Sequence, residues 1–159
     1  MIRSVILAAA GCLATLAPAY AQELELEGLD NRPIALTRAE FAALPHTGLK
    51  VDIEGKTGDF DGVELATMLA RIGAPTGKAL RGPELRDVVV VMGRDGYAAV
   101  LALAEVDPMV RREKVIVADE LDGRPLPAIE GPYRLVVEGD QRGARMVRMV
   151  TAIQLRRVN

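Results

Sequence analysis

Apolar and polar residues alternate along several short stretches of this chain, with the period of two that a half-buried β-strand shows. Glu23–Glu27 has this alternation, and Leu49–Ile53 repeats it. Val88–Met92 is a β-branched run, which also favours a strand. The predicted strands are 23–27, 34–36, 49–53, 88–92, 97–101, 115–118, 133–137 and 150–155.

Two segments carry the signals of short helices instead. Thr37 followed by Glu40 has the spacing of a capping box, which predicts a brief helix. Asp61 followed by Glu64 has the same spacing, and apolar residues at helical intervals predict a helix over 63–72. Many short strands with a few short helices predict the α+β class, with mixed β-sheets.

The start of the chain has the organisation of a secretory signal peptide. One basic residue precedes an apolar run, which ends in a small-x-small site at Ala21. Pro18 interrupts the run before it reaches the length of a membrane span, which argues against a retained anchor. A lipoprotein anchored through Cys12 is an alternative, although apolar residues continue after that cysteine. We therefore expect a signal peptide over 1–21, a periplasmic protein of residues 22–159 and no stable membrane anchor.

The composition of the predicted mature chain excludes several function classes. The whole chain carries 20 Lys and Arg against 22 Asp and Glu, and loss of Arg3 with the leader changes the formal net charge from −2 to −3. This mild acidity argues against a nucleic-acid partner. The only cysteine, Cys12, also leaves with the leader, so no thiolate ligand remains. His46 is the only histidine, and we interpret it as a surface-loop residue; zinc and haem sites are therefore not expected.

The second half of the chain carries the most specific signal. No Ser-His-Asp set, phosphate-binding glycine loop or cluster of metal ligands can be assembled from the sequence. Four phrases instead follow one another in order: Arg94–Tyr97, Val115–Pro127, Gly131–Gly139 and Gly143–Ile153. This succession resembles the oxidoreductase molybdopterin-binding domain of sulfite oxidase-type enzymes. There a tyrosine-containing strand precedes segments similar to LAYEMNGxPLP, HGxPxRLVVPG and GxxxVKWLxxI. Upstream, Phe60–Ala74 is similar to the WxGVxLxDLLxxAG segment of the same family.

The resemblance covers most of residues 23–157 and implies a pocket around an anionic pterin phosphate and a molybdenum centre with one protein thiolate. In the family, the metal-binding cysteine lies before the segment that matches Phe60. Here His46–Asp59 is shortened and contains no cysteine. Because soft metals select thiolates, this departure argues against catalysis but not against the fold. Molybdopterin remains a possible cofactor through the resemblance alone.

The resemblance also implies three candidate site residues: Tyr97, Arg134 and Arg148. Tyr97 matches an active-site tyrosine, whose hydroxyl donates to an oxyanion or moves a proton; the alternative is a strand tyrosine with a buried ring and a solvated hydroxyl. Arg134 matches the arginine before the valine-rich strand, and Arg148 replaces the lysine of VKW. Both suit phosphate or sulfite-like oxyanions, although Arg134 has the alternative of pairing with a nearby carboxylate. Glu130 replaces the family's histidine, an unfavourable exchange beside a phosphate.

These residues lead to one structural expectation and three hypotheses about function. Tyr97, Arg134 and Arg148 are expected to surround one concave site. The first hypothesis is a non-catalytic periplasmic module that binds a small oxyanion or a protein partner through the former cofactor pocket. The second is a molybdopterin-dependent oxidoreductase, or its cofactor-binding subunit, that holds the cofactor without a thiolate. The third is a structural interaction module.

Overall fold

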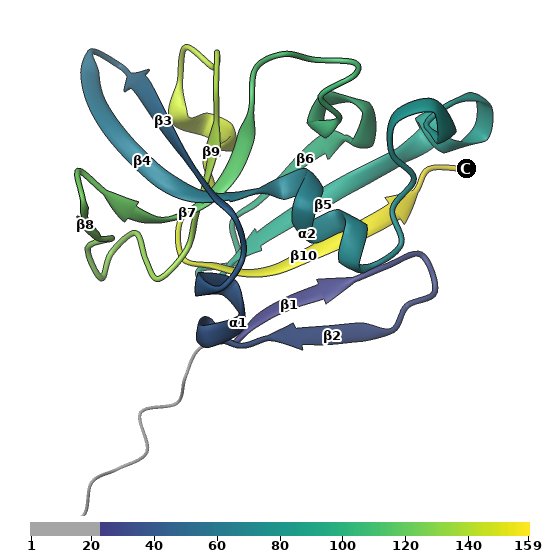
Figure 1. Ribbon diagram of the computed structural model, residues 1–159, viewed down its shortest axis with the longest axis horizontal. Coiled ribbons are helices and arrows are strands. Elements are labelled where there is room, and N and C mark those ends of the chain that lie inside the picture. The colour runs from purple at the N-terminus through teal and green to yellow at the C-terminus, as the bar shows by residue number, and fades with distance from the viewer. Residues whose placement is uncertain (1–22) are drawn as a thin grey trace, which may run out of the picture.

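The computed structural model describes residues 23–159, and the strands of this part of the chain form two sheets (Figure 1). The first sheet contains β1 (Leu24–Glu27), β2 (Pro33–Leu36), β5 (Asp87–Gly93), β6 (Ala98–Ala102) and β10 (Val150–Arg157). Its strand order is β2-β1-β10-β5-β6. β1 and β10, from opposite ends of the described chain, pair in parallel, and the other neighbours are antiparallel.

The second sheet contains β3 (His46–Ile53), β4 (Lys56–Glu64), β7 (Val115–Leu121), β8 (Arg124–Pro125) and β9 (Arg134–Val137). β3 and β4 form a hairpin, and β4 also pairs with β7. The other edge of β7 is shared, because β9 pairs with its first four residues and β8 with its last two. All pairs in this sheet are antiparallel, so the described chain combines an antiparallel sheet with a mixed one.

Short helices connect the strands: α1 (Arg38–Ala42), α2 (Leu65–Arg71), and the 3-10 helices η1 (Gly77–Ala79), η2 (Gly82–Arg86), η3 (Leu103–Val106) and η4 (Gly143–Arg145). The predicted capping box of α1 is confirmed, since Thr37 Oγ1 accepts the N–H of Glu40 and the Glu40 carboxylate accepts the N–H of Thr37. The predicted cap at Asp61 is wrong. Asp61 lies in β4, where pairing with β7 holds the backbone extended up to Glu64. The predicted α+β class with mixed sheets is confirmed.

Side chains alternate across β9, and this alternation separates two regions of the molecule. Leu135 and Val137 lie in the main core between the two sheets. Val136 lies on the opposite face, in a smaller apolar cluster that includes Phe60. Tyr133, just before the strand, joins the main core, whereas Arg134 lies over the Phe60 ring. Adjacent residues therefore serve opposite faces of the same sheet.

A β-bulge interrupts the pairing of β4 with β7. Asp61 pairs with Glu120 and Gly62 pairs with Ala118, so Asp119 is the extra residue without a partner in β4. The backbones approach so closely here that a Cβ on Gly62 would lie 2.2 Å from the carbonyl oxygen of Val117. Bulges re-aim side chains, and this one directs Asp119 out of the regular alternation.

The predicted leader, residues 1–21, lies outside the described residues. Within residues 23–159, none of the helices has the length and apolar character that crossing a bilayer requires.

Candidate functional site

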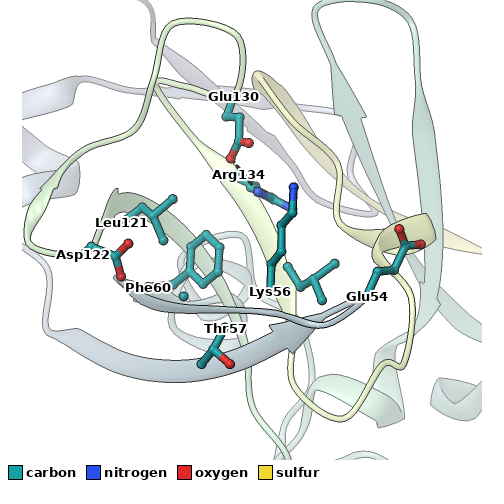
Figure 2. Close-up of a pocket in the computed structure, with 10 residues that line it drawn as sticks. Glu54, Lys56, Thr57, Phe60, Leu121, Asp122, Glu130 and Arg134 are labelled. Atoms are coloured by element: carbon teal, nitrogen blue, oxygen red, sulfur yellow. Dashed lines mark hydrogen bonds and ion pairs between the residues drawn. The ribbon is translucent and has the colours of Figure 1, made fainter.

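A cavity of about 330 Å³ opens between the β3–β4 hairpin and the end of β7 (Figure 2). Its apolar wall is formed by Ile53, Phe60 and Leu121, which belong to or pack against the smaller apolar cluster. Its polar side chains come from the hairpin, from the β7–β8 turn and from β9 with the segment before it. They are Glu54, Lys56, Thr57, Asp122, Glu130 and Arg134.

Arg134 is the most buried charged residue of this cavity, with 8% of its surface exposed. Its Nη1 donates to Glu130 Oε2 at 2.5 Å, and its guanidinium carbon lies 5.2 Å from the centre of the Phe60 ring. Such a position over an aromatic face is favourable for a cation. The Nε–H of Arg134 is buried and has no hydrogen-bond partner among the described residues. The predicted alternative for Arg134, a pair with a nearby carboxylate, is therefore what the structure shows.

The other charged side chains of the cavity are more exposed than Arg134, and they differ in whether the fold uses them for hydrogen bonds. Lys56 extends from β4 toward the Glu130–Arg134 pair in Figure 2. Asp122 is used by the fold, because its carboxylate accepts the N–H of Asp59 at 3.0 Å. Lys56 is thus a second, exposed cation at this cavity beside Arg134.

Tyr97 and Arg148 do not join Arg134 in this cavity. Tyr97 is 51% exposed at the β5–β6 turn, and its hydroxyl donates to the carbonyl oxygen of Ala144 at 2.6 Å. Arg148 is exposed and lines no part of the cavity. The expectation of one concave site around all three residues is not met, because Tyr97 and Arg148 lie in the β5–β6 and η4–β10 connections, whereas Arg134 begins β9. The ring of Tyr97 is not buried as its structural alternative required, since the turn holds it at the surface.

Comparison with known proteins places the domain in a family. A family model described as the oxidoreductase molybdopterin binding domain matches residues 15–159. The chain belongs to this family. A solved structure with a similar fold is the sulfane dehydrogenase SoxCD from Paracoccus pantotrophus, with a TM-score of 0.62 and 20% sequence identity. The match covers 84% of this chain and 37% of that one, so the chain spans well under half the length of that protein. A comparison with curated proteins gives no match.

The residues of this family member do not fit the molybdenum centre that the family implies. Such a centre uses a soft thiolate ligand, and residues 23–159 contain no cysteine. Glu130 pairs with Arg134 and Glu54 adds negative charge at the same cavity, so an anionic ligand there has to compete with these carboxylates. Within the described residues, no group of three His, Cys, Asp or Glu side chains is arranged to hold a metal ion.

A second group of polar side chains lies on the main-core side of β9, and it corrects the interpretation of His46 as a loop residue. His46 begins β3 and packs edge-on against Phe41, with ring centres 5.6 Å apart. Its Nδ1 lies 2.8 Å from the carbonyl oxygen of Leu44, and its Nε2 lies 3.4 Å from Oδ1 of Asp119. The β-bulge makes this contact possible, because it turns Asp119 out of the ladder.

Asp119 and Tyr133 are the unusual members of this group. Asp119 Oδ1 and Tyr133 Oη are both buried and have no hydrogen-bond partner among the described residues, so the 3.4 Å contact with His46 is an ion-pair distance without a completed hydrogen bond. A buried unsatisfied group of this kind costs about 1–3 kcal/mol. Burial raises the pKa of Asp119 above its ordinary value, against the lowering effect of His46. Burial also raises the pKa of Tyr133. The nearby charge of Arg38 lowers this pKa, and the charge of Asp119 raises it.

A signal for Asp119 exists in the sequence. In the phrase Val115–Pro127, Asp119 stands where the family segment LAYEMNGxPLP has its tyrosine. A carboxylate in place of an aromatic residue changes the chemistry of the position completely. His46 and Tyr133 carry no comparable signal, because only the fold brings them to Asp119.

Proposed function

We propose that this protein is a non-catalytic, exported member of the molybdopterin-binding domain family that binds a small anion through the cavity at Arg134. The observation that supports the proposal is the arrangement around that guanidinium. Arg134 and Lys56 present two cations to one cavity, and the Nε–H of Arg134 has no partner among the described residues. The missing thiolate supports the non-catalytic part of the proposal.

Glu130 acts in this proposal as an internal competitor for the ligand. Its carboxylate holds Nη1 of Arg134 at 2.5 Å, and 20% of its side chain is exposed. A ligand anion displaces this carboxylate into solvent and takes its place on the guanidinium, with Lys56 as the second contact. Charge-assisted hydrogen bonds are strong enough to support such an exchange, but the competition keeps the affinity modest.

Calorimetric titration of the full chain with sulfate and with sulfite tests this proposal. Lys56→Gln is expected to weaken binding by roughly tenfold, because one charge-assisted contact is lost. Glu130→Gln is expected to tighten binding by a similar factor, because the competing carboxylate is gone. Lys78→Gln, an exposed lysine in η1, is the control and should bind as the wild type does. Absence of binding in both the wild type and Glu130→Gln would contradict the proposal and leave the structural interaction module.

Export is the second part of the proposal, and it is supported by the sequence of the leader. The small-x-small site ending at Ala21 predicts a mature protein that begins at Gln22. Intact-mass measurement of protein recovered from the periplasm should give the mass of residues 22–159. A mass that includes Met1, or a lipid on Cys12, would contradict the predicted cleavage.

A molybdopterin-dependent oxidoreductase is the alternative function, and membership of the family favours it. In that case another ligand has to replace the thiolate. The metal content of the purified protein separates the two functions.

A further inference from the structure

A cavity of about 380 Å³ lies beside the group formed by His46, Asp119 and Tyr133. Its polar lining consists of Arg38, from the start of α1, together with Arg94 and Asp119. The remaining wall is apolar or small, formed by Pro125, Leu126, Ala128, Gly131 and Pro132. None of these residues lines the cavity at Arg134, so the two cavities are separate.

The cavity offers a guanidinium that the fold does not use. Arg38 is exposed and has no hydrogen bond or ion pair within residues 23–159. Thr37 and Glu40 form the capping box on either side of it, so the backbone that carries Arg38 is held in place. A positioned and unpaired guanidinium is a receptor for an anionic oxygen.

The second polar group of the cavity is the carboxyl of Asp119, and its two oxygens face different surroundings. Oδ1 is buried against His46 Nε2. Because His46 Nδ1 lies within hydrogen-bond distance of a carbonyl oxygen, that nitrogen carries a proton, and Nε2 of the neutral ring is an acceptor. In that arrangement Nε2 offers Oδ1 no donor, and the 3.4 Å contact between the two atoms is not a hydrogen bond. The Oδ2 edge of Asp119 is then the part that meets a molecule in the cavity.

We propose that this cavity is a second ligand site, for a small oxyanion that also carries a proton-bearing oxygen. The charged oxygens of the ligand pair with Arg38, and its O–H donates to the carboxylate of Asp119. Hydrogen phosphate and a small 2-hydroxy acid both have this chemistry. The hydroxyl of Tyr133 is buried and has no hydrogen-bond partner among the described residues, and its phenol is near enough to Asp119 for the two groups to interact electrostatically. This site involves none of the residues of the proposed function.

His46 supplies a specific probe, because it is the only histidine in the chain and its imidazole resonances are therefore unambiguous. The full chain is titrated at constant neutral pH with phosphate and glycolate, and with sulfate and acetate as matched anions that lack the O–H. Phosphate, glycolate or both are expected to shift the His46 Cε1–H resonance with saturation, at concentrations at least roughly tenfold below those that sulfate or acetate need. Which of the two protonated ligands binds more tightly distinguishes the inorganic from the organic source.

Three variants decide where the ligand lies. Arg38→Gln is expected to weaken the effect by roughly tenfold or more, whereas Arg32→Gln, an exposed arginine in the β1–β2 connection, should leave it unchanged. Asp119→Asn is expected to abolish the preference for the protonated ligand over its matched anion. Lys56→Gln, in the other cavity, should not change the His46 shift, which separates this result from that of the proposed function.

Several results would overturn the proposal. One is the absence of a saturable His46 shift with phosphate and glycolate. Another is an equal response to sulfate and phosphate in the wild type. A third is an unchanged response in a folded Arg38→Gln variant.

Discussion

Arg134 is a charged side chain buried beside apolar residues, with Glu130 as its ion-pair partner. A buried pair contributes little net stability, because both charges lose their hydration. Removing one partner has a larger effect, since the other charge stays in place without compensation. In the proposed function, the same pair also lowers the affinity of Arg134 for a ligand. Its effect on the free energy of unfolding becomes measurable only when one partner is removed.

Glu130→Gln is expected to lower the free energy of unfolding by about 1–3 kcal/mol. This is less than the roughly 3–5 kcal/mol for a fully buried pair, because Glu130 is partly exposed. Adding Arg134→Met should restore part of this loss, so the double variant is more stable than the sum of the two single changes predicts. Urea denaturation measures all three variants. Lys50→Gln, which removes an exposed pair with Asp59, is the control and should change stability by less than about 1 kcal/mol. Strict additivity would show that Arg134 and Glu130 do not compensate each other.

Asp119 gives a prediction for the pH dependence of stability. Burial raises its pKa in the folded protein above the ordinary value of 3.8, so the folded state binds this proton more tightly than the unfolded chain does. The stabilisation from the protonated form is complete below the unfolded pKa and is lost as the pH rises through the raised folded pKa. The Asp119→Asn variant lacks this titration. As the pH rises from the unfolded to the folded pKa of Asp119, the free energy of unfolding of this variant should therefore fall less than that of the wild type. Urea denaturation across a pH series checks this, with Asp59→Asn as an exposed control that keeps the wild-type slope.

At the scale of elements, the bulge between β4 and β7 is the feature that connects packing to the candidate sites. It places Asp119 outside the ladder and restores the pairing of Phe60 with Leu121, which form the wall of the Arg134 cavity. One local irregularity therefore serves both cavities. The irregularity depends on Gly62, where the two backbones are too close for any side chain.

Gly62→Ala is expected to destabilise the fold by roughly 2–4 kcal/mol, because the new Cβ would lie 2.2 Å from Val117 O, an atom of a central strand that cannot move alone. Thermal unfolding measures the loss. Gly48→Ala is a matched control in β3, where the nearest atom, Phe60 O, is 4.0 Å from the added Cβ, and it should change stability by less than about 1 kcal/mol. Equal effects of the two substitutions would show that the close approach at the bulge does not limit stability.

At the scale of the whole molecule, the chain has the fold of its family, and residues 23–159 lack a thiol. Two sheets enclose the core, and the family model extends to the last residue. The charged groups at the cavity include carboxylates, and residues 23–159 offer no thiol. A domain that retains packing residues and replaces ligand residues can keep its stability while its function diverges.

The protein purified from a host that makes molybdopterin is therefore expected to contain far less than one molybdenum atom per chain. The reason is the absence of a thiolate, the ligand that soft metals select. Elemental analysis by mass spectrometry gives the ratio, and a thiolate-containing member of the family, expressed in the same host, is the positive control. Stoichiometric molybdenum would overturn the non-catalytic proposal and favour the oxidoreductase.

The regular elements followed from local patterns wherever those patterns were strong. The capping box at Thr37 and the β-branched run at Val88–Met92 needed no tertiary information. β4 was missed because Lys56–Glu64 contains two glycines and few apolar residues, a composition typical of loops. Pairing on both sides, with β3 and β7, overrides that weak local preference.

By itself, the sequence determined the fold class, the family and the loss of the thiolate, because each depends on residue types and their order. Only the tertiary structure decided the sites. Alternation across β9 sends Tyr133 and Arg134 to opposite faces, and a single extra residue in β7 brings Asp119 to His46. Such contacts join segments far apart in the chain through strand register, and a one-residue change of register reverses which face a side chain occupies. No pattern within one segment contains that information.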